Sequence, residues 1–213
     1  MDKFNELRRR HPRFFYNSCG FAVSGDDLVF SFEFELESGI FFRPRIAARG
    51  GRRGFEAEDE TLKNIAFHLG LMEIPSYWKA ACSPEIVVRA GGLSAYQVQW
   101  LEKLLFKGMG EFFFVNGLGF SGPDFVNILA EGNSVSASVS RAAGVGGDKI
   151  LIPVGGGKDS IVSIEILKKS GRGLGAFLLN PTRAARAIVR ESGIKEAIVF
   201  EREIDSRLIN LNR

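Results

Sequence analysis

Cysteine, histidine and long apolar runs are all scarce in this sequence. Its 213 residues include two cysteines and two histidines. Cys19 and Cys82 form no CxxC or Cys/His spacing, which argues against a zinc site and a disulfide scaffold and favours a reduced, cytoplasmic setting. No eighteen apolar residues run together and charges interrupt residues 1–15, so we expect neither a membrane span nor a secretion signal.

A large excess of charge is also missing. The net charge of +3 is too small on this length to favour a nucleic-acid partner. Arginines cluster in two places, where Phe, Pro and Gly interleave them: Arg8–Arg10, and Arg43, Arg45, Arg49, Arg52 and Arg53. We expect solvated loops there, with binding of an anionic substrate as the alternative. A composition of 45% hydrophobic and 25% charged residues is that of a globular protein with a real core.

The first part of the chain has the pattern of an antiparallel hairpin. Residues Asp27–Glu37 alternate strictly between apolar and polar side chains, as in a half-buried strand. Cys19–Ser24 precedes them across Gly25-Asp26, so these two segments are expected to pair. The Arg/Gly-rich segment Arg43–Gly54 predicts a mobile loop.

Helical patterns follow the hairpin. Residues 62–69 place apolar side chains on one helical face, and a short strand is expected at Glu85–Arg89. Ser94 and Gln97 form a Ser-x-x-Gln capping box at the start of a second helix. Gly108 predicts a left-handed cap at its end.

Gly132–Gly147 is rich in Ser, Gly and Ala and is the predicted linker or substrate-adjacent loop. We therefore expect an N-terminal α+β domain over residues 1–145. In residues 146–213 strand and helix patterns alternate, which favours a parallel sheet with helices on its faces. These expected elements are strand Lys149–Val154, a helix to Lys169, strand Leu174–Leu179, helix Thr182–Ser192 and strand Glu196–Phe200.

A glycine run joins the first of these strands to its helix and predicts phosphate chemistry. Its residues are Gly155, Gly156, Gly157, Lys158, Asp159 and Ser160. Glycines let a ligand approach main-chain N–H groups without meeting a Cβ, and the helix N-terminus adds unpaired donors. The Walker A pattern is excluded, because Ile152 stands where its first glycine is needed and Asp159 where it has Ser or Thr. Asp159 is equally suited to capping the helix.

The run resembles the Ser-Gly-Gly-x-Asp-Ser loop of the ATP pyrophosphatase (PP-loop) superfamily, with Gly155 in place of the first serine. The resemblance implies that residues 146–213 form the first part of a PP-loop sheet, incomplete in this chain. It also implies cleavage of ATP between the α and β phosphates and transfer of AMP to an oxygen of the substrate.

Two further segments extend the likeness. Glu73–Cys82 (EIPSYWKAAC) and Lys107–Phe112 (KGMGEF), together with the glycine run, are similar to the family of ATP-dependent epimerases of UDP-N-acetylmuramoyl-L-alanyl-L-glutamate (UDP-MurNAc-L-Ala-L-Glu). The resemblance implies conversion of the terminal L-glutamate to D-glutamate for peptidoglycan synthesis, with ATP and Mg²⁺. Family members continue past the point matching Arg213, which implies a missing C-terminal segment or a second chain.

Carboxylate adenylation explains why such a reaction needs ATP. Removing the α-proton of a free carboxylate creates a costly dianion, and adenylation neutralises the carboxylate first. The resemblance implies that Gly155, Gly156, Gly157, Lys158 and Ser160 bind the pyrophosphate portion, and that Asp159 holds magnesium or the loop conformation.

Candidates for the remaining roles lie elsewhere in the chain. Inversion needs a base on one face of the carbon and a proton donor on the other. The candidates are Lys79, Cys82, Tyr77 and His68. Buried cysteines are commonly inert, and a structural histidine is the favoured alternative for His68. Tyr77 and Trp78 either stack on the uracil ring or pack in the core. Asp205 either contacts substrate or lies on the surface of a C-terminal helix.

Two other functions are consistent with the same glycine run. One is a different PP-loop enzyme that forms amides or modifies tRNA. The other is a non-catalytic fragment that binds nucleotide weakly.

Overall fold

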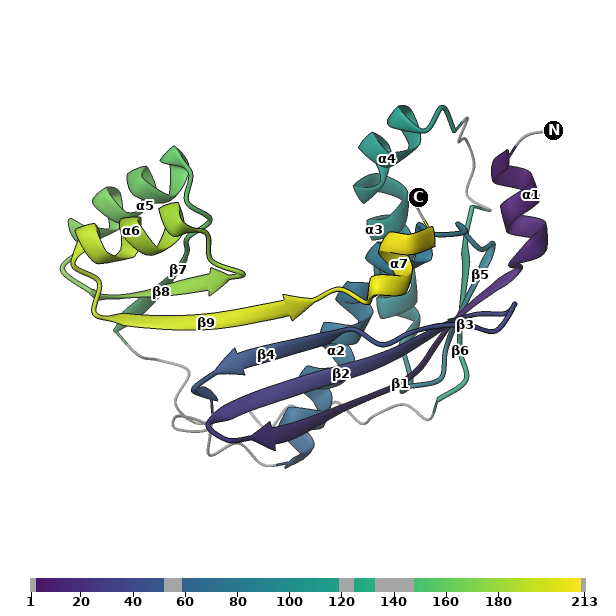
Figure 1. Cartoon of the computed structure of the whole chain (residues 1–213), viewed down its shortest axis with the longest axis horizontal. Helices are drawn as coiled ribbons and strands as arrows, with labels where there is room; N and C mark the ends of the chain where they lie inside the picture. Colours follow the sequence, from purple (N-terminus) through teal and green to yellow (C-terminus); the bar gives the residue numbers. More distant parts are fainter. Residues whose placement is uncertain (1–2, 52–58, 119–124, 133–147, 212–213) are drawn as a thin grey trace.

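A single mixed sheet runs through the molecule. A computed structural model describes residues 3–51, 59–118, 125–132 and 148–211. Within these residues nine strands form the sheet in the order β6-β5-β1-β2-β4-β9-β8-β7, with β3 paired to β2 (Figure 1). The antiparallel hairpin and the parallel strands with helices, expected in two successive domains, are both present, and they form one mixed α/β sheet; the PP-loop assignment stays a prediction.

The strands alternate with seven helices over the described residues. The strands are β1 (Arg13–Ser24), β2 (Asp27–Leu36), β3 (Ile40–Phe42), β4 (Arg45–Arg49), β5 (Glu85–Val88), β6 (Asn127–Ala130), β7 (Lys149–Pro153), β8 (Gly173–Leu179) and β9 (Glu196–Glu203). The helices are α1 (Lys3–Arg10), α2 (Asp59–Trp78), α3 (Ala95–Gly108), α4 (Gly110–Val115), α5 (Lys158–Lys168), α6 (Arg183–Ser192) and α7 (Ser206–Leu211).

The predicted hairpin is confirmed as β1–β2. Ser24 pairs with Asp27 across a turn in which Gly25 has a φ of 63°. Alternation in β2 buries one row of side chains against α2, because successive residues of a strand point to opposite faces. That row is Leu28, Phe30, Phe32, Phe34 and Leu36, and each side chain is at most 3% exposed.

Helix α2 crosses the hairpin at very close range. An ideal Cβ on Gly70 would lie 1.9 Å from the Tyr16 hydroxyl oxygen and 2.9 Å from Cδ1 of Phe32. Tyr16 uses this approach to donate its hydroxyl hydrogen to the Phe67 carbonyl at 3.2 Å. Gly70 therefore sets how deeply the helix seats on the sheet.

Two local expectations were wrong. Arg43–Gly54 is not simply a loop, because its central residues form β4. Ile46 and Ala48 face the core at alternate positions, and the strand pairs with β2 on one side and β9 on the other. Gly108 is not a left-handed cap, since α3 closes on Met109 at φ −100°. The capping box of Ser94 and Gln97 is confirmed.

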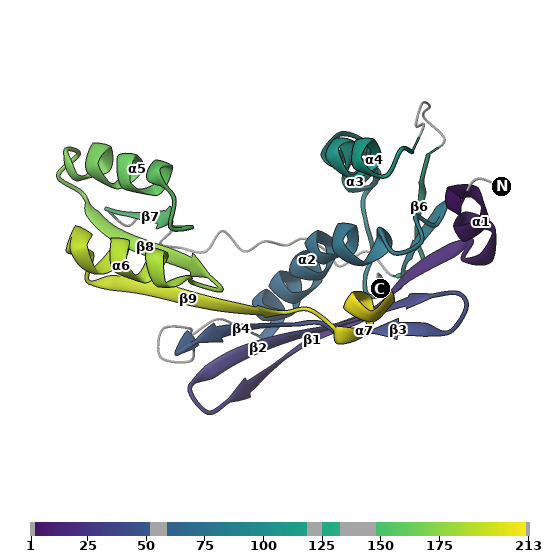
Figure 2. The same ribbon diagram turned by 45° about the horizontal axis from the view of Figure 1, so that its top comes forward.

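The predicted parallel order is confirmed in β7, β8 and β9, whereas helices on both faces of these strands are not found among the described residues. These strands pair in parallel, and α5 and α6 lie on one face of them (Figures 1 and 2). The helices cover a small core formed by Ile152, Val154, Ile164, Ala176, Leu178, Ala185 and Val189. The proposed boundary between residues 145 and 146, and nearly all of the linker expected at 132–147, lie outside the described residues.

Strand β9 joins the two halves of the sheet. It pairs in parallel with β8 and antiparallel with β4. Val199 packs against the small core under α5 and α6, whereas its neighbour Phe200 packs against the large aromatic core under α2. Because adjacent strand residues point to opposite faces, the two cores lie on opposite sides of one sheet.

A partly buried ion pair fixes β9 to α2. The Arg202 guanidinium donates to both carboxylate oxygens of Glu73, at 2.7 and 2.8 Å, and to Ser76 Oγ at 2.9 Å. These hydrogen bonds raise the pKa of Arg202. A bidentate contact of this kind fixes the orientation of the two side chains as well as pairing their charges.

We expect Gly70→Ala to destabilise the fold by about 2–3 kcal/mol, because the added methyl group must displace Tyr16 or the whole helix. Urea unfolding of the purified protein measures the change. Gly108→Ala is the matched control: its nearest neighbour would be 3.9 Å away, so its stability should stay within about 1 kcal/mol of the wild type. Equal effects of the two substitutions would contradict the close crossing.

Candidate functional site

The glycine run forms a tight turn between β7 and α5. The buried Val154 ends the strand pairing by donating its N–H to the Phe177 carbonyl at 2.9 Å. The chain then turns through Gly156, whose φ of 97° suits glycine alone, and Gly157 is the N-cap of α5. The predicted strand, glycine turn and helix are all confirmed.

The turn is packed on one side and open on the other. A Cβ on Gly156 would come within 3.0 Å of both Ala185 N and Thr182 Oγ1, at the start of α6. A Cβ on Gly155 or Gly157 would meet nothing within 4 Å. Gly156 therefore seats the turn against α6, while the two outer glycines leave backbone accessible to a ligand.

The polar residues of the run differ in what they do. Ser160 Oγ accepts a hydrogen bond from Gly155 N at 3.2 Å and braces the turn. Lys158 and Asp159 are exposed in the first turn of α5. Asp159 does not cap that helix, because the cap position belongs to Gly157, which has no side chain to accept hydrogen bonds from the first-turn N–H groups.

A second loop reaches the same edge of the sheet. After β8, Asn180 adopts a φ of 43° and its side-chain amide exchanges two hydrogen bonds with the Arg202 backbone, at 2.7 and 2.9 Å. Thr182 then caps α6 by accepting from Ala185 N at 3.1 Å. The N-termini of α5 and α6 thus converge at the carboxyl ends of β7 and β8, where open α/β sheets bind their ligands.

An arginine groove adjoins this edge. It has a volume of about 610 Å³ and is lined mainly by β4, β9 and the start of α6. Arg45 and Arg49 come from β4, Arg186 from α6, and Glu201 and Glu203 from β9. The sequence clustered the β4 arginines, but only the pairing of β4 with β9 places them opposite α6.

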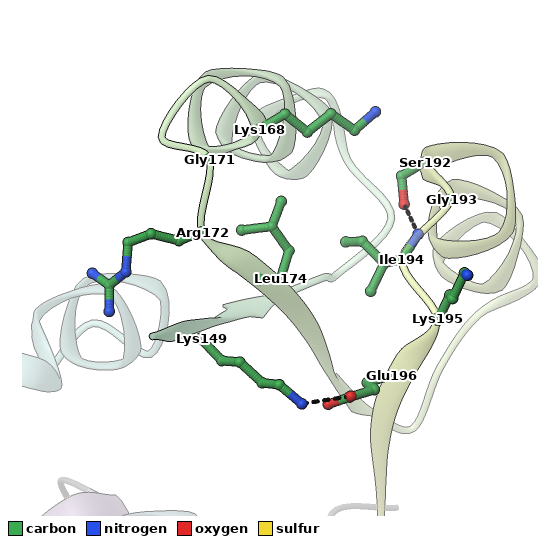
Figure 3. Close-up of a pocket in the computed structure, with 11 residues that line it drawn as sticks. Lys149, Lys168, Gly171, Arg172, Leu174, Ser192, Gly193, Ile194, Lys195 and Glu196 are labelled. Atoms are coloured by element: carbon green, nitrogen blue, oxygen red, sulfur yellow. Dashed lines mark hydrogen bonds and ion pairs between the residues drawn. The ribbon is translucent and has the colours of Figure 1, made fainter. Parts of the chain in front are cut away.

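A second cavity lies at the opposite edge. Figure 3 shows basic residues of a cavity of about 430 Å³ at the amino ends of the parallel strands, among them Lys149, Lys168 and Lys195. Lys149 pairs with Glu196 at 2.6 Å, and Lys168 lies in the last turn of α5. Basic side chains near helix C-termini stabilise the helix dipole, so the ion pair of Lys149 and the position of Lys168 give both residues a structural explanation.

Tyr77 and Trp78 are fully buried. The Trp78 indole N–H donates to the Ser83 carbonyl at 2.8 Å and its ring packs edge-on against Phe125. The Tyr77 hydroxyl accepts from Asp205 N at 3.1 Å, and burial raises its pKa to about 12. Both rings therefore pack in the core, which is one of the two interpretations given for them, and their contact with substrate stays a prediction.

Asp205 organises the chain after β9. Its two carboxylate oxygens accept backbone N–H groups, from Arg43 at 2.6 Å and from Arg207 at 2.9 Å. The structure thus brings Asp205 next to Tyr77, as part of the contact that holds α7 near the end of α2.

Lys79 and Cys82 are not brought to the glycine turn. Cys82 is 3% exposed and lies in the large core, where the Arg8 guanidinium donates to its carbonyl at 2.7 Å. Burial raises the pKa of the Cys82 thiol to about 12. The Lys79 ammonium lies 6.0 Å from the centre of the Phe112 ring. Figures 1 and 2 place α1 and the end of α2 far from α5, and a role in proton transfer stays a prediction for both residues.

Few protein side chains at this edge could coordinate magnesium. No group of three or more His, Cys, Asp or Glu side chains gathers among the residues described. Asp159 is the acidic residue in the first turn of α5. One carboxylate fits Mg²⁺ bound mainly by phosphate oxygens and water, because that ion commonly keeps such ligands.

These features define an α/β protein with a glycine turn open to a ligand at the carboxyl edge of a parallel sheet. The chain belongs to the MurL N-terminal domain family, whose sequence model matches residues 5–213. None of the helices in the described ranges is both long and apolar enough to cross a membrane. No solved structure matches the chain.

Three relatives carry the name UDP-N-acetyl-alpha-D-muramoyl-L-alanyl-L-glutamate epimerase. The protein from Salinispora tropica is 28% identical over 98% of this chain and 45% of its own length. The one from Xanthomonas oryzae pv. oryzae is 30% identical over 65% of this chain and 29% of its own length. The Micromonospora protein is 30% identical over 72% and 34% respectively. The chain thus spans less than half the length of these relatives.

We expect Gly156→Ala to destabilise the protein by about 2 kcal/mol, because alanine is strained at this φ and its methyl group would press on α6. Gly155→Ala, with open space around its Cβ, should leave the unfolding midpoint nearly unchanged. Thermal and urea unfolding of both variants provide the comparison. A Gly155→Ala variant as unstable as Gly156→Ala would contradict the described geometry.

Cys82 should resist alkylation in the folded protein. With its pKa raised from 9.0 to about 12, its thiolate fraction near neutral pH is lower by roughly a thousandfold. Iodoacetamide labelling at about pH 8, followed by peptide mass spectrometry, measures the rate, and the urea-unfolded protein supplies the reference. Equal rates in the two states would show a reactive thiolate and support the predicted catalytic role.

Proposed function

We propose that this chain is the N-terminal, nucleotide-binding part of an enzyme that epimerises the terminal L-glutamate of UDP-MurNAc-L-Ala-L-Glu with ATP. The names of the relatives support the substrate and the epimerisation. The observation that carries the ATP dependence is the glycine turn, whose outer glycines are open at the carboxyl edge of the sheet. Backbone donors beside a helix N-terminus favour a phosphate ligand.

The chemistry calls for activation of a carboxylate. Loss of the α-proton from glutamate would place a second negative charge beside the carboxylate, which is costly at the low dielectric of a protein site. Transfer of AMP to a carboxylate oxygen, with release of pyrophosphate, removes that charge. Epimerisation then needs only proton exchange at the α-carbon, and water restores the carboxylate and releases AMP.

Each residue of the turn has a proposed part in holding the nucleotide. The backbone N–H of Gly157 would face the phosphates, and Gly155, whose own N–H donates to Ser160, would leave space for them. Lys158, exposed at the start of α5, would neutralise phosphate charge as the transferred group moves. Asp159 would hold Mg²⁺ together with phosphate oxygens, and Ser160 would keep the turn in shape through Gly155 N.

The activity is proposed for the whole enzyme, of which this chain supplies the first part. Strand β7 has one strand partner among the described residues, β8. On the face opposite α5 and α6, Leu151, Leu179 and Ile198 are 51%, 49% and 47% exposed. Parallel sheets are normally covered on both faces, so we propose that further chain pairs with β7 and covers this surface.

Loss of the Lys158 charge should weaken ATP binding by at least tenfold, or about 1.4 kcal/mol. Calorimetric titration of Mg²⁺-ATP into wild type and Lys158→Ala measures this effect. Lys169→Ala is the matched control, since Lys169 caps the opposite end of α5. Unchanged affinity in Lys158→Ala would refute the nucleotide role of the turn.

The reaction itself is tested with the Salinispora tropica relative. Incubation with ATP, Mg²⁺ and UDP-MurNAc-L-Ala-L-Glu should yield AMP, pyrophosphate and, after acid hydrolysis, D-glutamate. Formation of ADP and phosphate, or epimerisation without ATP, would contradict the proposal.

A further inference from the structure

The arginine groove contains two arginines that form no ion pair among the described residues. Arg49 is paired with Asp27 and Glu201, and Arg202 with Glu73. Arg45 and Arg186 make no ion pair with any residue that the structure describes, and both are exposed. They come from β4 and α6, two elements separated by more than a hundred residues of chain.

The two arginines differ from the other arginines of the groove in lacking a hydrogen-bonded carboxylate in the described part of the chain. Arg49 is shared between Asp27 and Glu201; its hydrogen bond lowers the pKa of Glu201, and the nearby charge of Arg186 acts in the same direction. Glu203 lies opposite Arg45 in the β4–β9 register and is the groove's remaining carboxylate. The side chains of Arg45 and Arg186 nevertheless form no hydrogen bond or ion pair with the described residues, so their guanidinium N–H groups are available to a ligand, and a planar guanidinium binds phosphate or carboxylate through two parallel hydrogen bonds.

The groove is connected to the glycine turn through one helix. Arg186 lies one turn after Thr182, and Thr182 contacts Gly156 at the inner side of the turn. Strands β9 and β4 are two and three places from β7 in the sheet. At a strand spacing of about 4.8 Å, the groove is thus about 10–15 Å from the turn. Phosphate groups bound at the turn would not reach across this distance. An anion in the groove would therefore belong to a second substrate.

We propose that Arg45 and Arg186 bind an oxyanion of the substrate that receives AMP, either the diphosphate or a carboxylate of a nucleotide-linked acidic dipeptide. This inference rests on the proposed function. It assigns the groove to the second substrate and the glycine turn to ATP. The two anionic groups thereby lie on the same face of the sheet and along one edge.

Binding measurements on the 213-residue protein test this assignment. The probes are UDP-MurNAc-L-Ala-L-Glu, UDP, the dipeptide L-Ala-L-Glu and Mg²⁺-ATP, each titrated by calorimetry into wild type, Arg45→Gln, Arg186→Gln and the double variant. Arg190→Gln is the control, because Arg190 lies on α6, pairs with Glu191 and does not line the groove. We expect each groove substitution to raise the Kd of the nucleotide dipeptide at least tenfold and to leave the Kd of ATP within twofold.

The results distinguish which group of the substrate binds in the groove and whether the assignment holds. Loss of UDP binding identifies the diphosphate as the bound group, and loss of dipeptide binding identifies a carboxylate. Equal weakening by Arg190→Gln, loss of ATP binding alone, or absence of binding of all three non-ATP probes to the wild type would overturn the assignment. A failed epimerase reaction with intact, arginine-dependent binding would instead refute the proposed function and leave the groove as an anion site. Circular dichroism confirms that the variants fold.

Discussion

The antiparallel pairing of β4 with β9 is the constraint on which the rest of the molecule depends. It joins an antiparallel hairpin layer to three parallel strands, so that one sheet carries two cores on opposite faces. Val199 and Phe200, adjacent in β9, each serve a different core. The Glu73–Arg202 contact holds this strand to α2 from the other side. Removing Arg202 would leave the Glu73 carboxylate largely buried without its partner, which costs free energy.

The pairing of β4 with β9 also determines which face of the sheet is open to a ligand. Helix α2 occupies one face of the sheet at β4 and β9, through Glu73 and Arg202, and leaves the other face to the arginine groove. The glycine turn, the cap of α6 and the groove then share one edge and one face. The segment around Glu73 and Tyr77, which carried much of the family likeness, contributes contacts that position β9 and Asp205. These contacts support the site from the face of the sheet that carries α2.

Local patterns predicted much of this fold and little of its long-range pairing. Period-two alternation in residues 27–37 and the Ser94–Gln97 capping box depend on near neighbours, and both were predicted correctly. Strand β4 was missed because Arg45–Arg49 has two small or apolar inward residues among arginines, and its stability comes from β2 and β9. The glycine turn was found because its glycines stand together in the sequence. The arginines of β4 were assigned to a solvated loop, with anion binding as the alternative, because they meet Arg186 only after residue 203 has paired with residue 45. Burial of Tyr77, Trp78 and Cys82 depends on tertiary packing that their spacing does not reveal.

Oxygen tracing tests the central claim, transfer of AMP to the substrate carboxylate, most directly. UDP-MurNAc-L-Ala-L-Glu labelled with ¹⁸O in the glutamate α-carboxylate would be incubated with ATP, Mg²⁺ and the protein, alone and alongside the Salinispora tropica relative. If AMP is transferred to that carboxylate and water then attacks the acyl carbon, mass spectrometry should find one ¹⁸O in the released AMP. AMP without label, together with D-glutamate that has lost none of its ¹⁸O, would contradict the account.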